Sequence, residues 1–278
     1  MLELRQQHSL ANLLQAADLP RSVFYYQRSA IATPCKYEAL KSKIKELFHC
    51  HSGRYGYRRI TAALLQLGQH VNHKTVQRLM GELGLKSLVR PKKYKSYKGE
   101  IGRTAPNLLK RKFKAKRANE KWVTDVTEFK VADKKLYLSP VLDLYNGEII
   151  AYETSERPMF DMVGTMLRNA LSKLKGEDKP MLHSDQGWQY QMPAYQRMLQ
   201  ERQVVQSMSR KGNCHDNAAM ESFFAVLKTE FFYLNKFKSV EELKTGLDKY
   251  IHYYNHDRIK MKLGGLSPVQ FRTRHFAA

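Results

Sequence analysis

Apolar residues recur along the chain in two different patterns, and the pattern changes after position 119. In the first part they recur every three to four residues, as on one face of a helix. This spacing predicts two short helices within residues 9–28, another over residues 36–50 and a helix–turn–helix over residues 57–83. Pro20 cannot continue the first helix but suits the start of the second. The front of the chain is therefore expected to be all-α.

The second part alternates strand and helix patterns. Three segments rich in β-branched and aromatic residues, separated by short turns, predict consecutive antiparallel strands over residues 121–131, 135–145 and 148–156. Further strands are expected over residues 180–185 and 204–209, and helices over residues 160–175, 192–202, 217–232 and 239–256. This order of elements predicts an α/β fold, a mixed five-stranded sheet flanked by helices.

The helix expected over residues 217–232 reads NAAMESFFAVLKTEFF and has two kinds of face. At about 100° per residue, one stripe is apolar. It consists of Met220, Phe223, Phe224, Leu227 and Phe231. A polar line at its edge holds Asn217, Glu221 and Lys228. Taken alone, this pattern is typical of a core helix with a solvated edge, so any other interpretation of Glu221 depends on the rest of the chain.

Composition narrows the class of partner. The 278 residues are 42% hydrophobic, enough for a packed core. The 48 Lys and Arg exceed the 26 Asp and Glu, which gives a net charge of +22. Such an excess predicts nucleic acid rather than a membrane as partner, and no apolar run approaches the roughly 18 residues of a membrane span. The start of the chain lacks a signal-peptide pattern and the three cysteines lack CxxC spacing, so a cytoplasmic, nucleoid-associated location is expected.

The second helix of the helix–turn–helix begins after Asn72, a good N-cap residue. It is expected to bury Val76, Leu79 and Met80. Its other face carries side chains that suit phosphates and base edges in a major groove. They are His73, Lys74, Gln77 and Arg78. We interpret the segment as a DNA-binding element; a helical hairpin with ordinary solvated charges is the alternative.

A basic segment follows over residues 86–117. It holds 13 Lys or Arg against one acid, Glu100, and so supplies +12 of the net charge. Prolines and glycines break regular structure there, and two tyrosines lie among lysines, as in segments that track a nucleic-acid strand. We expect a phosphate-binding linker, with a solvated tether as the alternative. Its candidate contacts are Lys92, Lys93 and Lys95.

Three carboxylates lie where strands and a helix are expected to converge. Asp125 is in the first strand, Asp185 at the end of the fourth, and Glu221 near the start of the helix after the fifth. A carboxylate in an apolar strand is costly unless it is paired or binds a metal. Carboxylate oxygens suit Mg²⁺ or Mn²⁺, and two such ions assist phosphoryl transfer. Asp143 and Glu128 are rival acids with structural explanations, at a strand end and on the opposite strand face.

Several segments in combination resemble the signature blocks of DDE transposases of the insertion sequence three family, whose core is similar to that of retroviral integrases. The blocks are WVTDVTEF, HSDQGWQY and KGNCHDNAAMESFFAVLKTE. Thirty-five residues separate Asp185 from Glu221, as the family's D-D-35-E pattern requires, and Lys228 matches its basic position. YNHDRIKMKLGGLSPVQF resembles its C-terminal block, and GRYGYRRITAAL, with Arg58 and Arg59, its helix–turn–helix block. The resemblance covers nearly the whole chain.

The resemblance implies an RNase H-like integrase catalytic core in which Asp125, Asp185 and Glu221 hold two Mg²⁺ or Mn²⁺ ions. It also implies that Lys228 faces substrate DNA and that Asn217 supports the site or touches the DNA backbone. The implied reactions are cleavage at an element end and strand transfer by the freed 3′-OH, along a copy-out, paste-in route. A DNA-binding regulator with an inactive core and a structure-selective nuclease of the same fold are the alternatives.

The implied partners are double-stranded DNA of the transposon ends and target, further copies of the chain, and an upstream reading frame joined in a frameshift fusion. We expect five regions along the chain. They are an N-terminal helical region (1–50), a helix–turn–helix region (51–86), a basic linker (87–118), the catalytic core (119–235) and a C-terminal helical extension (236–278).

Overall fold

The computed structural model describes residues 3–32, 36–89, 104–210 and 213–276. The helices expected at the front of the chain are confirmed. After a short 3₁₀ helix (Glu3–Gln6) they are α1 (Leu10–Ala16), α2 (Arg21–Ala32), α3 (Glu38–Cys50), α4 (Tyr57–Gln66) and α5 (His73–Glu82). Residues 38–88, which contain α3, α4 and α5, are called the helical unit below.

The helical unit has its own apolar core, to which all three helices contribute. Asn72 caps α5, as expected, because its side chain accepts a hydrogen bond of 2.8 Å from the backbone nitrogen of Lys74. The predicted inner face of α5 is also confirmed, since Val76, Leu79 and Met80 are all buried. The polar face of α5 is therefore left on the surface of the unit.

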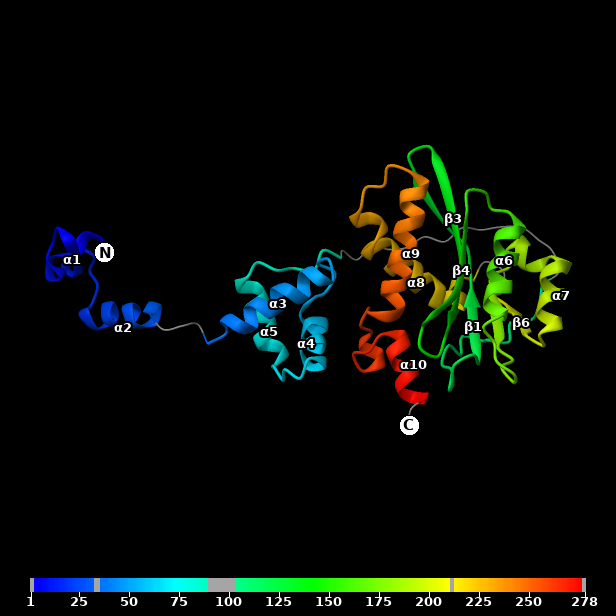
Figure 1. Ribbon diagram of the computed structural model, residues 1–278, viewed down its shortest axis with the longest axis horizontal. Helices are drawn as coiled ribbons and strands as arrows, with labels where there is room; N and C mark the ends of the chain where they lie inside the picture. Colours follow the sequence, from blue (N-terminus) through cyan, green and yellow to red (C-terminus); the bar gives the residue numbers. More distant parts are fainter. Residues whose placement is uncertain (1–2, 33–35, 90–103, 211–212, 277–278) are drawn as a thin grey trace.

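A mixed sheet forms the centre of the second part (Figure 1). Its strands are β1 (Lys121–Thr124), β2 (Thr127–Val131), β3 (Lys134–Asp143), β4 (Ile149–Ser155), β5 (Met181–Ser184) and β6 (Val205–Met208). Strand β3 pairs antiparallel with β1, β2 and β4, whereas β1–β5 and β5–β6 are parallel pairs. The expected α/β class and mixed sheet are confirmed.

The sheet has six strands rather than the five expected, because the strand predicted over residues 121–131 is interrupted at Asp125. Strands β1 and β2 nevertheless pair with β3 in one continuous register. That register would place Pro140 opposite Asp125, and proline has no amide hydrogen to donate to a neighbouring strand. The strand is thus interrupted opposite a residue of β3 that lacks a backbone donor, and the residue at the interruption is Asp125.

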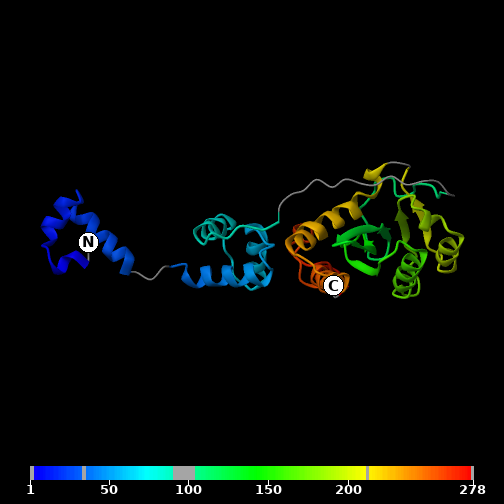
Figure 2. The same ribbon diagram turned by 90° about the horizontal axis from the view of Figure 1, so that it is seen from above.

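Helices cover both faces of the sheet. They are α6 (Phe160–Leu171), α7 (Pro193–Glu201), α8 (Ala218–Glu230), α9 (Val240–His256) and α10 (Pro268–Phe276). Helices α8 and α9 pack on one face, and α6 and α7 on the other (Figures 1 and 2). The predicted apolar stripe of α8 is confirmed, because all five of its side chains are buried against α9 and the sheet. Within the described ranges, no helix is long and apolar enough to cross a bilayer.

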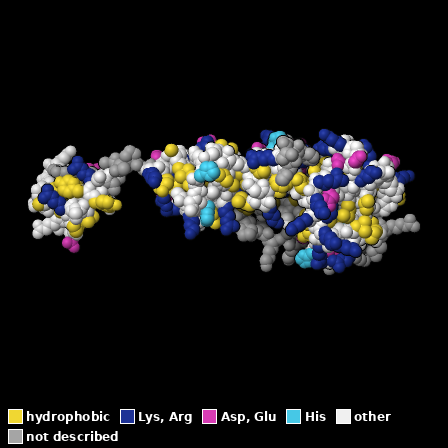
Figure 3. All heavy atoms as spheres, turned by 90° about the horizontal axis from the view of Figure 1, so that it is seen from below, with side chains coloured by type: hydrophobic (Ala, Val, Ile, Leu, Met, Phe, Trp, Pro, Cys, Tyr) yellow, Lys and Arg dark blue, Asp and Glu magenta, His cyan; other side chains and the backbone are white. Residues whose placement is uncertain are grey.

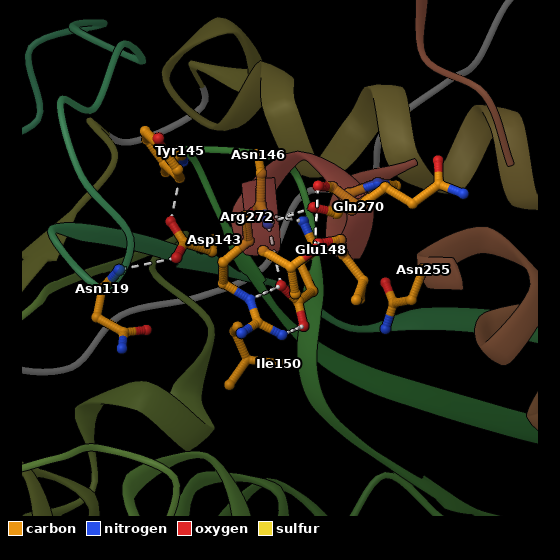
Figure 4. Close-up of polar contacts among 12 residues, drawn as sticks. Asn119, Asp143, Tyr145, Asn146, Glu148, Ile150, Asn255, Gln270 and Arg272 are labelled. Carbon is orange, nitrogen blue, oxygen red and sulfur yellow. Dashed lines mark hydrogen bonds and ion pairs between the residues drawn. The ribbon is translucent and has the colours of Figure 1, made fainter. Parts of the chain in front are cut away.

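Polar contacts attach the last two helices to the turn between β3 and β4 (Figure 4). Arg272 of α10 donates two hydrogen bonds, of 2.7 and 3.1 Å, to the carboxylate of Glu148. The side-chain amide of Asn255 in α9 makes two hydrogen bonds with the backbone of Ile149, of 2.9 and 3.0 Å. The C-terminal helices are thereby joined to the same sheet as α8. The domain limits expected from the sequence stay a prediction.

Aromatic side chains join the helical unit to α9. His51 stacks on Tyr55 with 3.8 Å between ring centroids, and its Nδ1 lies 3.2 Å from the hydroxyl of Tyr253. Burial lowers the pKa of His51 to about 4; the carboxylate of Asp257 opposes this shift and nearby arginines reinforce it. His51 is therefore neutral at pH 7.

We expect the free energy of unfolding to fall as the pH is lowered from 6.5 towards 4, in part through His51. In this window His51 of the unfolded chain binds a proton that His51 of the folded chain does not. The stabilisation that comes from neutral His51 is therefore complete above pH 6.5 and is lost as the pH falls towards 4. Its upper limit is about 3 kcal/mol. Urea denaturation at several pH values should show a weaker acid dependence for His51→Asn than for wild type. His70→Asn, at an exposed position, is the control, and equal acid dependence in all three proteins would contradict the prediction.

Candidate active site

Asp125 and Asp185 follow the ends of two neighbouring parallel strands. Val123 of β1 is level with His183 of β5, and each strand ends one residue later. The next residue in each chain segment is an aspartate, so the two carboxylates come from adjacent positions at one end of the sheet. Each makes a local hydrogen bond that fixes its turn. An oxygen of Asp125 accepts from the nitrogen of Val126 (2.7 Å), and one of Asp185 accepts from that of Gly187 (2.9 Å).

The strand that leads to Asp185 is held by a buried histidine. Ser207 Oγ accepts hydrogen bonds from the backbone nitrogens of Leu108 and Leu109, so its own hydrogen is left for His183 Nδ1, 2.8 Å away. The ring proton then lies on Nε2, which donates to Ser209 Oγ at 3.1 Å. Burial lowers the pKa of His183 to about 4. A neutral imidazole thus joins β5, β6 and the end of the linker.

Helix α8 carries Glu221 to the same end of the sheet. Asn217 precedes this helix and donates a hydrogen bond of 3.1 Å to the carbonyl oxygen of Thr124, the residue before Asp125. Glu221 lies four residues further on, about one helical turn. The start of α8 is therefore tied to the end of β1, and Glu221 is on the same side of the sheet as α8.

The three carboxylates influence one another electrostatically. Burial raises the pKa of Asp125 well above its ordinary value, and the charges of Asp185 and Glu221 raise it further. Burial is also the main cause of the raised pKa values of Asp185 and Glu221. Among the described residues, no three His, Cys, Asp or Glu side chains are gathered closely enough to hold one ion.

The donor set suits hard cations such as Mg²⁺ and Mn²⁺, because it consists of carboxylate oxygens. A second observation agrees with this fit. The side-chain oxygen of Asn217 is buried and accepts no hydrogen bond from any described residue. Buried oxygens of this kind normally have a partner, and a hydrated cation next to the acids could supply it.

Lys228 lies on the same face of α8 as Glu221, but it is less exposed than a solvated edge would require. The side chain is half-buried, with its ammonium 5.4 Å from the centre of the Phe129 ring. Burial lowers the pKa of Lys228, whereas the carboxylates of Glu128 and Asp125 act in the opposite direction. The ammonium is thus close enough to Asp125 to feel its charge. Asn217, expected on the same polar line, is buried.

The rival acids have the structural roles expected of them. Asp143 is buried and accepts backbone hydrogen bonds from Asn119 (2.8 Å) and Tyr145 (2.9 Å), as Figure 4 shows. Burial raises its pKa to about 6. Glu128 is exposed and forms an ion pair of 3.1 Å with Lys135.

Besides Lys228 and Asn217, the residues predicted to contact DNA are divided by the structure into three groups. Side chains of the first group are exposed on the helical unit: Arg58, His73, Lys74, Gln77 and Arg78. Arg59 instead forms an ion pair of 3.2 Å with the buried carboxylate of Glu230 in α8. Lys92, Lys93 and Lys95 lie outside the described residues. On the face drawn in Figure 3, Lys and Arg side chains are spread over both the helical unit and the catalytic part, and several acids lie among them on the catalytic part. DNA contact by each of these residues stays a prediction.

Sequence analysis missed Asp216, which fixes the loop before α8. This buried carboxylate accepts hydrogen bonds from the guanidinium groups of Arg210 (2.9 and 3.0 Å) and Arg111 (2.9 Å) and from the side chain of Asn107 (2.8 Å). These bonds, led by those from Arg210, hold its pKa well below the ordinary range. The available signal was an acid that follows Arg210 and Lys211 and comes directly before Asn217.

Comparison with known protein families matches most of the chain. Residues 36–93 match an HTH-like domain, and residues 115–214 and 221–276 match two families described as integrase core domain. Three curated relatives are similar over most of the chain. The Escherichia coli K12 putative transposase InsK for insertion sequence element IS150 is 55% identical over 274 residues, 99% of this chain and 97% of that protein.

The other two relatives are more distant. The probable transposase for insertion sequence element IS1353 of Shigella flexneri is 40% identical over 97% of this chain and 53% of its own length. Transposase InsF for insertion sequence IS3A of E. coli K12 is 35% identical over 81% of this chain and 78% of its own length. With relatives of this identity along almost its whole length, the chain belongs to the insertion sequence three family of transposases, which have an integrase core domain.

Proposed function

We propose that this transposase binds the DNA ends of an insertion sequence and catalyses metal-dependent phosphodiester cleavage and strand transfer. One observation carries the proposal. Asp125 and Asp185 follow level ends of the parallel strands β1 and β5, and a hydrogen bond from Asn217 to Thr124 ties the start of α8, with Glu221, to the same place. Three carboxylates from distant segments are thus carried by elements that meet at one end of the sheet.

The proposed chemistry consists of two in-line phosphoryl transfers. Water first attacks a phosphodiester at an element end and breaks its bond to the 3′-oxygen, which leaves a 3′-OH and a 5′-phosphate. The 3′-OH then attacks a second phosphodiester and displaces the 3′-oxygen of that strand. Two divalent ions, when bound, activate the attacking oxygen and stabilise the leaving oxygen. Asp125, Asp185 and Glu221 would hold these ions, and their buried hydrogen-bonded supports keep the carboxylates in place. Lys228 would pair with a DNA phosphate next to the acids.

The helical unit would supply binding to the element ends through α5, whose polar face is exposed. We further propose that several copies act together on DNA in the bacterial cytoplasm. Action as one part of a longer fusion protein agrees with the length of the S. flexneri relative, of which this chain matches 53%.

Replacement of the acids should separate activity from stability. Asp125→Asn, Asp185→Asn and Glu221→Gln should each lower cleavage and strand transfer on an element-end duplex by about a hundredfold or more. The same variants should unfold at equal or higher urea concentration than wild type, because burial and like charge disfavour the ionised carboxylates. Asp133→Asn, in the exposed turn between β2 and β3, should keep wild-type activity.

Retention of near-wild-type joining with Mg²⁺ by any of the three variants would remove that residue from the site. The same assay distinguishes the proposed transposase from the two alternative functions. A regulator with an inactive core would cut no DNA with Mg²⁺ or Mn²⁺, and a structure-selective nuclease would cut without joining strands.

Replacement of Lys228 should test its charge separately from its packing on Phe129. Lys228→Met keeps an unbranched apolar stem but removes the ammonium, so strand transfer from pre-cleaved ends should fall while folding is retained. Lys228→Arg should keep part of the activity, because it preserves charge with a different head group. In Lys228→Cys, the introduced thiol should form a crosslink to the terminal nucleotides of the element end, because residue 228 is proposed to lie beside them. Full activity of Lys228→Met, together with no crosslink near the cleaved end, would assign Lys228 a packing role only.

Substitutions in the helical unit should distinguish sequence readout from phosphate binding. Without metal, binding of the full chain to an element-end duplex should weaken with salt, with a log–log slope near −0.9 per phosphate contact. Replacing His73, Lys74 and Arg78 by Ala should reduce discrimination between element ends and random DNA. Replacing Lys92, Lys93 and Lys95 should weaken binding to both DNAs about equally. Salt-independent binding would contradict the electrostatic interpretation.

A further inference from the structure

The helical unit contacts the catalytic helix α8 through a buried charge. Glu230, in the last turn of α8, is only 3% exposed. Its carboxylate accepts hydrogen bonds of 2.7 and 2.6 Å from Arg258 and one of 3.2 Å from Arg59 of α4. Its backbone carbonyl accepts a hydrogen bond of 2.9 Å from Arg54, whose guanidinium lies 4.9 Å from the centre of the Tyr253 ring. Two arginines of the helical unit therefore converge on one residue of α8.

A second set of contacts joins the unit to the segment after α9. The hydroxyl of Tyr55, a fully buried residue, donates to the carbonyl of Asp257 (3.2 Å) and accepts from the nitrogen of Ile259 (2.8 Å). Ile259 itself packs in the core of the helical unit. Gln66 of α4 donates a hydrogen bond of 2.6 Å to the carbonyl of Gly265. The contact is therefore built from buried and specifically paired groups, not from a chance approach of two surfaces.

The contact links two elements that the proposed function assigns to DNA. Helix α5, with the predicted base-reading face, packs in the same core as α4. Helix α8 carries Glu221 near its start and Glu230 in its last turn, about 13 Å apart along the axis at 1.5 Å per residue. A rigid path thus leads from α5 through α4 to Glu230 and along α8 to Glu221.

We propose that docking of the helical unit on α8 sets the distance along the DNA between the bound end sequence and the phosphodiester that is cut. Arg54, Arg59 and Glu230 are positioning residues in this proposal, because none of them touches the reacting atoms. The proposal rests on the proposed function and adds to it a molecular ruler, meaning a docked contact that fixes the distance from the bound sequence to the cleaved bond. It also gives Arg59 a role other than the DNA contact expected from the sequence.

The first test varies the DNA. Element-end duplexes with two, five or ten base pairs inserted between the footprint of the helical unit and the cleaved bond are incubated with the full chain and Mg²⁺. If the unit is docked, the cleavage position should shift together with the footprint, or the cleavage rate should fall about a hundredfold. Small misplacements of the reacting bond have effects of that size. The ten-base-pair insertion restores the rotational phase of B-DNA and separates an effect of distance from one of phase.

The second test varies the contact. Arg59→Ala and the double variant Arg54→Ala/Arg59→Ala should bind the unmodified duplex as tightly as wild type in a footprint, but should cut it at several neighbouring bonds. Arg59→Lys keeps the charge towards Glu230 and should recover most of the single-site cleavage. Lys43→Ala is the matched control, because this lysine of α3 pairs within its own helix with Glu46 at 2.9 Å. These variants leave the buried pair of Glu230 and Arg258 in place.

Two outcomes would overturn the ruler. One is wild-type cleavage at the original bond, with undiminished rate, on all inserted duplexes; the other is unaltered cleavage positions in Arg54→Ala/Arg59→Ala. In both cases the proposed function would stand, because cleavage itself is observed. Failure of wild type to cut the unmodified duplex with Mg²⁺ or Mn²⁺ would instead reject the proposed function, and the ruler with it.

Discussion

Strand β1 is hydrogen-bonded to β3 on one side and to β5 on the other, and its position determines that of the proposed active site. The parallel register with β5 brings Asp125 and Asp185 to the same end of the sheet. The third acid arrives by another route, through the hydrogen bond from Asn217 to Thr124 that starts α8 beside β1. Because side chains alternate between the faces of a sheet, a shift of one residue in this register would turn Asp125 to the opposite face.

The site concentrates negative charge in a chain with a net charge of +22. Burial and neighbouring carboxylates raise the pKa of Asp125, so its ionised form is disfavoured in the absence of a cation. Lys228 offsets this only in part, since its own charge is disfavoured by burial. Such strain at a site is common where function requires it. The surrounding apolar stripe of α8 and the neutral His183 network supply the rigidity that keeps the acids in place.

Helix α8 also carries a second charged group with a different role. Glu230 is paired with Arg258 in the interior, and both side chains are almost fully buried. Loss of one partner from such a pair costs on the order of 3–5 kcal/mol, because the other charge is left buried without compensation. Helix α8 therefore carries the proposed metal ligand Glu221 near its start and the attachment of the helical unit in its last turn.

The sequence by itself determined the helices, most strands and the α/β class, and it predicted a nucleic-acid partner and a site of three acids. These follow from local periodicity, from composition and from motif spacing, all of which lie along the chain. Only the tertiary structure decided that the first strand breaks at Asp125, since the proline opposite belongs to β3. It also decided that Arg59 pairs with Glu230, 171 residues away, and that Asn217 is buried against a strand 93 residues earlier. Such pairings depend on how distant elements pack, and no local pattern of side chains encodes them.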